Sequence, residues 1–145
     1  MPALLYEQVY QAIMEPVPER KCSLTQQLYE DWSAGLLVRQ DDADIQQIDV
    51  PGRPPLPQLV NARQVPKRSL ATEQGRQVLL HSFAHIEFNA INLALDAVYR
   101  FRQMPEAYVT DWLQVAAEEA RHFSLNDQYL QELGSGYGAY DANNG

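Results

Sequence analysis

The region from Arg76 to Leu133 contains no glycine and a single proline, Pro105. Because glycine and proline interrupt helices most strongly, this stretch predicts two long helices that meet near Met104–Pro105. Thr72 is suited to cap the first helix, and Gly134 stands where the second is expected to end. A connection of only about two residues makes the two helices antiparallel neighbours in space.

The first half of the chain has a different pattern. Residues 2–14 begin with a proline suited to a first helical turn, and the helix that they predict stops before Pro16. Residues 24–35 follow a capping-box pattern over Ser23–Gln26 and predict a second short helix. Residues 38–70 hold five prolines and no helical period, so we expect an extended strap around the helices.

These patterns predict one all-α domain, because a chain of 145 residues with 46% hydrophobic and 21% charged residues can build a core of its own. No apolar run reaches the ~18 residues of a membrane span, and the N-terminal residues lack the features of a signal peptide. We therefore expect a cytoplasmic protein that makes no contact with a membrane. The expected parts are short helices over 1–37, the strap over 38–71, the helical hairpin over 72–134 and a glycine-rich tail over 135–145.

The charge and cysteine counts limit which ligands the protein can bind and which residues can hold a metal. The net charge of −8 disfavours tight binding of nucleic acid, which requires clustered lysine and arginine. Residues 73–145 carry ten acidic and four basic groups, so their carboxylates are either solvated or hold cations. A single cysteine, Cys22, excludes an internal disulfide and a thiolate cluster. Histidines and carboxylates remain as candidate metal ligands.

Two glutamates interrupt the apolar arcs of the long helices. On a helical wheel Glu87 and Glu119 lie inside these arcs, and His122 lies at the edge of the second arc, whereas Glu118 points outward. Burying a carboxylate costs several kcal/mol unless it is protonated, paired or bound to metal. The arcs consist of Leu80, Phe83, Ala84, Ile91, Ala94, Leu95, Val98 and Phe101, and of Trp112, Val115, Ala116, Phe123, Leu130 and Leu133.

The hairpin relates the two glutamates to each other. Glu87 and Glu119 each lie about 16 residues from the expected turn, so they should face each other at the same height. Glu119 and His122 also have the Glu-x-x-His spacing of di-iron carboxylate bundles, in which one Glu and one Glu-x-x-His occur twice. The spacing predicts a metal site, against the alternative of a salt-bridged or protonated pair.

The other two histidines, His81 and His85, lie one turn apart on the first long helix, which is a possible metal spacing. Their face is about 100–140° from the apolar arc on the wheel. We therefore expect them to pack against the strap or to meet solvent, with a supporting role beside a metal site left open.

The runs HIEFNAINLALDAVYRFR and EEARHF, together with the proline-rich VPGRPPLPQLVNARQVPKRSL, closely resemble a bacterial ferritin-like family, domain of unknown function 455. The resemblance implies a four-helix metal-carboxylate bundle and a distant similarity to a tRNA-modifying di-iron hydroxylase. It places the metal positions on Glu87, Glu119 and His122. It also implies two divalent ions per site, iron or alternatively manganese, and a small-molecule or RNA substrate.

Members of that family continue into a second helical hairpin that carries the other Glu and Glu-x-x-His. The chain therefore resembles an N-terminal half, and we expect a homodimer to complete the bundle and the ligand set. The leading hypothesis is an oxidoreductase that activates oxygen or peroxide, with Glu119 bridging two metals, Glu87 as a terminal ligand and His122 supplying nitrogen. The alternatives are a helical scaffold or interaction module without metal, and iron storage or detoxification.

Overall fold

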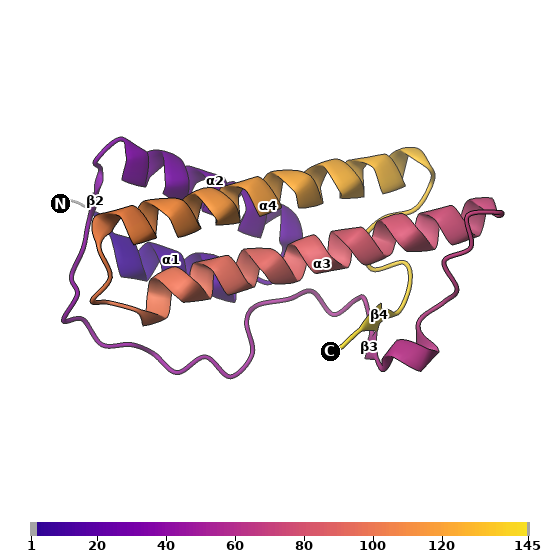
Figure 1. Cartoon of the computed structure of the whole chain (residues 1–145), viewed down its shortest axis with the longest axis horizontal. Coiled ribbons are helices and arrows are strands. Elements are labelled where there is room, and N and C mark those ends of the chain that lie inside the picture. Colours follow the sequence, from indigo (N-terminus) through magenta and orange to yellow (C-terminus); the bar gives the residue numbers. More distant parts are fainter. Residues whose placement is uncertain (1–2, 145) are drawn as a thin grey trace.

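The computed structural model describes residues 3–144 and consists mainly of four helices. Two long helices, α3 and α4, form an antiparallel hairpin, and the shorter α1 and α2 cover one side of it (Figure 1). This arrangement confirms the all-α prediction. The helices are α1 (Leu5–Met14), α2 (Pro18–Ser33), α3 (Glu73–Arg100) and α4 (Glu106–Glu132).

Short strands tie the non-helical segments to one another. Strand β1 (Ala3–Leu4) pairs in parallel with β2 (Leu37–Val38), which closes the N-terminal helices into a unit. Strand β3 (Leu59–Val60) pairs in parallel with β4 (Ala142–Asn143), which joins the strap to the C-terminal tail. A 3-10 turn, η1, spans Ala62–Gln64.

The hairpin helices begin and end close to the residues that the sequence predicted. The Thr72 hydroxyl accepts a hydrogen bond from the Gly75 N–H at 2.9 Å, which caps α3 as predicted. Gly134 has a φ of 83° just after α4, a conformation that glycine adopts without strain. Residues 101–105 connect the helices, so the connection is longer than the two residues expected.

The second helix begins earlier than the sequence analysis predicted. Helix α2 starts at Pro18, six residues before the predicted start at Leu24, so the predicted capping box over Ser23–Gln26 lies inside the helix. Pro18 explains the difference, because proline has no N–H to leave unpaired and its fixed φ suits a first helical turn. Gly35, with a φ of 74°, ends this region close to the predicted position.

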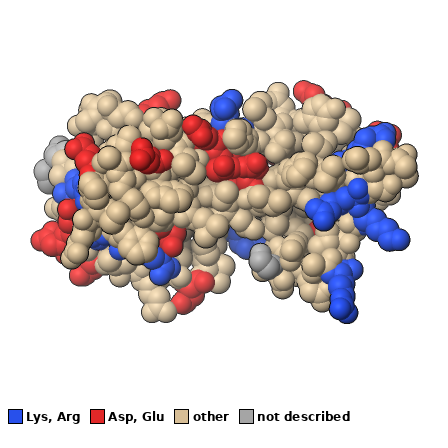
Figure 2. All heavy atoms as spheres, in the orientation of Figure 1, with Lys and Arg blue, Asp and Glu red and all other residues tan. Residues whose placement is uncertain are grey.

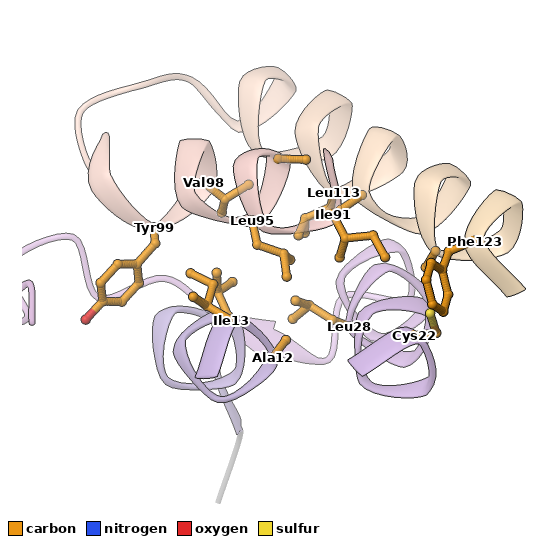
Figure 3. Close-up of a cluster of buried hydrophobic side chains, with 14 of the residues drawn as sticks. Ala12, Ile13, Cys22, Leu28, Ile91, Leu95, Val98, Tyr99, Leu113 and Phe123 are labelled. Carbon is orange, nitrogen blue, oxygen red and sulfur yellow. The ribbon is translucent and has the colours of Figure 1, made fainter. Parts of the chain in front are cut away.

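All four helices contribute to one hydrophobic core. Figure 3 shows Ala12 and Ile13 from α1, Cys22 and Leu28 from α2, and side chains from α3 and α4 converging on the same centre. The α3 and α4 members labelled there are Ile91, Leu95, Val98, Tyr99, Leu113 and Phe123. The short N-terminal helices thus bury much of the hairpin's apolar surface themselves.

The buried face of α3 is rotated from the predicted one. Phe83 and Phe101, placed in the core by the wheel, are 45% and 54% exposed, and Trp112 on α4 is 37% exposed. His81 and Phe88 are buried instead. The reason is that α1 and α2 approach the hairpin from one side only, so the opposite part of each apolar arc is left at the surface.

The strap is attached to the rest of the molecule by polar contacts. Arg39 donates hydrogen bonds to the carbonyls of Arg102 and Met104 at the hairpin turn. Arg102 in turn donates to the Ala43 carbonyl and stacks on the Tyr6 ring, 3.7 Å from its centroid. Further along, Gly52 packs so tightly on the end of α1 that a Cβ atom there would overlap the Met14 carbonyl.

Among residues 3–144, α3 is the one helix with the length and apolarity to cross a membrane. Half of its most apolar window is buried within the protein. Such burial is typical of a helix in the core of a globular domain.

Candidate metal centre

Glu87, Glu119 and His122 meet on the two long helices, at the height that their distances from the turn predicted. One donor atom from each of the three side chains lies within 4.8 Å of the other two. His122 Nδ1 is 3.8 Å from a Glu87 carboxylate oxygen and 3.9 Å from a Glu119 carboxylate oxygen. These distances are too long for hydrogen bonds. The three groups therefore surround a common point, but His122 makes no hydrogen bond to either glutamate.

The donor set fits a divalent cation. Two ligand atoms that each lie about 2.1 Å from one ion are about 3 to 4 Å apart, and the two measured separations fall in this range. Two carboxylates carry the charge that one divalent ion neutralises, and an imidazole with two carboxylates suits iron, manganese or zinc. Among residues 3–144, no lysine or arginine forms a salt bridge with Glu87 or Glu119.

The site is more open than the sequence analysis predicted. The side chains of Glu87 and Glu119 are 23% and 25% exposed, and that of His122 is 43% exposed. The two glutamates thus lie at the edge of the buried face rather than in its middle. Their desolvation cost is smaller than that of a fully buried carboxylate, so exposure to water is itself part of what stabilises them here.

Helices α1 and α2 cover one side of the hairpin, and we call the side that they leave uncovered the open face. Because Glu87, Glu119 and His122 stay partly exposed, we assign the site to this face. Exposed apolar side chains accompany the site there, from Phe83 on α3 to Trp112 and Val115 on α4. In the same orientation as Figure 1, Figure 2 shows acidic side chains near the middle of the view, surrounded mostly by uncharged surface. An acidic centre within a mostly uncharged surface is therefore exposed to solvent in the single chain.

Glu118 is exposed and points away from the site, as the wheel predicted. His81 and His85 also lie outside the cluster. The expectation that they meet the strap or solvent was wrong, because both are buried and their hydrogen bonds run mainly to the C-terminal tail. His81 Nε2 accepts a hydrogen bond from the Gly138 N–H at 3.0 Å, and His85 Nδ1 lies 2.8 Å from the Tyr137 hydroxyl. Both histidines thus anchor the C-terminal tail.

The sequence predicted the glycine-rich tail over 135–145 but not its packing against the core. Tyr137 packs against the rings of His81, His85, Phe88 and Phe123, so this partly buried side chain extends the core although it follows Gly134 and Gly136. Burial raises the pKa of its hydroxyl well above the usual range. The available signal was the pair Tyr137 and Tyr140 within a glycine-rich segment, since aromatic residues in a mobile tail have no reason to be so closely spaced.

The sequence also matches a known protein family. The family model for DUF455, described as a protein of unknown function, matches residues 14–145. The chain belongs to the DUF455 family. This match spans α2, the strap, the hairpin and the tail, and it therefore includes all three members of the candidate site.

The chain is also similar to an uncharacterized protein of Haemophilus influenzae, strain Rd. The two are 41% identical over 150 residues, covering 97% of this chain and 52% of the relative. The DUF455 chain thus spans about half the length of the curated relative that it matches. No solved structure matches the chain.

Proposed function

We propose that this protein is a ferritin-like di-metal carboxylate protein of the cytoplasm, with oxidoreductase activity that uses oxygen or peroxide. The observation that carries the proposal is the convergence of Glu87, Glu119 and His122 on one point, without a lysine or arginine partner among the described residues. Iron is the expected metal, with manganese as an alternative, because both accept carboxylate and imidazole ligands. The substrate class is a small molecule or RNA.

Each residue has a distinct role in this proposal. Glu87 and Glu119 would each supply carboxylate oxygen to the metals, with Glu119 as the bridging ligand and Glu87 as a terminal one. His122 adds a neutral nitrogen donor one helical turn from Glu119. When bound, the metals supply the oxidising chemistry. The exposed Phe83 and Trp112 exclude water from the site once the open face is covered.

One chain offers three ligands, whereas a bundle of this class uses two sets of one Glu and one Glu-x-x-His. A second copy placed across the open face would supply the second set. Four glutamates would then balance two divalent ions, with two imidazoles completing the coordination. The homodimer is therefore part of the proposed function.

The test is metal binding by the purified protein. Loaded anaerobically with Fe²⁺ and desalted, the wild-type chain should retain close to one ion per chain by elemental analysis, since two ions are shared by two chains. Glu119→Ala should retain less than a tenth of that amount, because it removes the bridging ligand. Glu118→Ala, one residue away and exposed, is the matched control and should bind as the wild type does.

The outcomes separate the proposal from its alternatives. A wild-type chain that retains no metal would overturn the proposal and favour a scaffold or interaction module. Equal loss in the Glu119 and Glu118 variants would mean that the site has been assigned to the wrong residues. Retention of many ions per chain, without turnover of an organic substrate, would favour iron storage or detoxification.

A further inference from the structure

A second site lies on another side of α3, between that helix, the strap and the C-terminal tail. It is a pocket of about 470 Å³, which is within the size range of small-molecule sites. None of the three candidate metal ligands lines it. Its apolar wall includes Ile48 and Leu59 from the strap and Phe88 from α3, and its polar groups include Arg53 and Asn92.

Lys21 lies directly behind this pocket and is fully buried. Its Nζ donates hydrogen bonds to the Ala12 carbonyl at 3.1 Å, to the Ile13 carbonyl at 2.6 Å and to Asn92 Oδ1 at 2.6 Å. Ile13 and Asn92 both line the pocket. Among residues 3–144 Lys21 forms no salt bridge, and burial lowers its pKa to about 7.

The bond from Lys21 fixes the orientation of the Asn92 amide. Because Oδ1 accepts from the ammonium group, Nδ2 is the group of this side chain left to donate. Asn92 is 92% buried, and within residues 3–144 its Nδ2 has no hydrogen-bond partner. Asn92 lines the pocket and Nδ2 is not fully enclosed, so this donor is available to an acceptor that enters there.

The charges around the pocket favour an anion. The Arg53 guanidinium donates to the carbonyls of Pro54 and Pro57 and forms no salt bridge with any described residue. Of the acidic residues in the lining, Asp96 accepts two hydrogen bonds from Arg100 at 2.8 Å and is thereby neutralised. Asp49 remains as one negative charge against the full positive charge of Arg53 and the charge that Lys21 carries when it is protonated.

We propose that this pocket binds a small organic carboxylate with an apolar body. The carboxylate accepts a hydrogen bond from Asn92 Nδ2 and lies near the positive charges of Lys21 and Arg53. The apolar body contacts Phe88 and the strap residues Ile48 and Leu59. This site is independent of the proposed metal centre, so its ligand can be tested on metal-free protein.

The test is a titration of the full chain, labelled with ¹⁵N, by benzoate and by hexanoate, with benzamide and hexanamide as neutral controls of nearly the same shape. We expect saturable shifts of the Asn92 amide and of residues 48–53 with at least one carboxylate below about 10 mM. The matching amide should bind at least tenfold more weakly, because it carries no charge.

Two variants and one control identify the groups responsible. Asn92→Asp keeps the side-chain shape and the oxygen that accepts from Lys21. It replaces the Nδ2 donor by a negatively charged oxygen that repels the ligand's carboxylate, so the affinity for benzoate or hexanoate should fall at least tenfold. Arg53→Met should also weaken the binding of the carboxylate, because it removes a positive charge from the pocket lining. Arg68→Met removes an exposed arginine of the same strap that lies outside the pocket, and affinity should be unchanged.

The proposal is overturned if neither carboxylate produces saturable shifts below about 10 mM. It is also overturned if the amides bind as tightly as the acids, or if folded Asn92→Asp protein retains wild-type affinity. The comparison of acid with amide uses wild-type protein alone, so it remains decisive even where a variant fails to fold.

Discussion

His81 is the residue whose protonation most directly affects how the tail is held. Its ring is almost completely buried, stacks on Tyr137 and accepts a hydrogen bond from the Gly138 N–H. Burial, with a further contribution from the neighbouring His85, lowers the pKa of His81 to about 4. Only the neutral imidazole can accept that hydrogen bond, because the protonated ring has two donors and no acceptor.

This pKa predicts a loss of stability in mild acid. The unfolded chain binds the proton near pH 6.5, whereas the folded chain binds it only near pH 4. The contribution of His81 is therefore complete above about pH 6.5 and falls as the pH drops toward 4, by about 3 kcal/mol in total. Urea unfolding at pH 7, 5.5 and 4.5 should show this decrease, and His81→Gln should show a shallower one. An equal pH dependence in both proteins would contradict the assignment.

At the scale of elements, the tail connects parts of the chain that are far apart in sequence. Strand β4 pairs with β3 of the strap, and the Tyr137 N–H donates to Asp127 of α4 at 2.7 Å. The Tyr140 hydroxyl donates to Gln77 of α3 at 3.0 Å. The tail thus joins the strap to both hairpin helices, and Tyr137 is the tail side chain that packs against the core.

Tyr137→Ala is accordingly expected to lower the free energy of unfolding by about 3 kcal/mol, because it removes a partly buried aromatic ring that packs against Phe88 and Phe123. Limited proteolysis should then cut the tail after Gly134. Tyr129→Ala is the matched control, since this α4 tyrosine is 52% exposed, and it should change stability by less than about 0.5 kcal/mol. A similar effect of both substitutions would show that the tail is not part of the core.

At the scale of the whole molecule, the open face is the surface that remains to be covered. The N-terminal helices occupy one side of the hairpin only, and the other side carries both the candidate metal ligands and exposed aromatic residues. An apolar surface of this kind around a polar centre is typical of an interface. A two-fold axis through it would bring the two sets of three ligands together.

We therefore expect a dimer in solution that depends on the open face. Val115→Glu should convert it to a monomer with helical structure retained, because the added charge would be buried in the interface. Leu24→Glu on α2 is the matched control, since Leu24 and Val115 are both 37% exposed. Sedimentation equilibrium and circular dichroism measure the two properties. A monomeric wild-type chain would contradict the dimer and favour cover by a further segment, such as the other half of the longer relative.

Several features could be predicted from the sequence because they depend on local geometry. The absence of glycine and of all but one proline from Arg76 to Leu133 determined the hairpin. Helical periodicity determined that Glu87, Glu119 and His122 would meet, since it sets the height and direction of each side chain. The cap at Thr72 and the glycine after α4 followed from the same local rules.

Other features were decided only by tertiary structure. A wheel identifies an apolar arc but not which part of it a neighbouring helix will cover, so Phe83 and Trp112 are exposed although their spacing predicted burial. The burial of His81 and His85 depends on a tail more than fifty residues away in sequence. The orientation of the Asn92 amide, with Nδ2 left to donate, likewise depends on Lys21 of α2 reaching α3. Contacts between distant segments depend on how whole elements pack, and local periodicity carries no information about that choice.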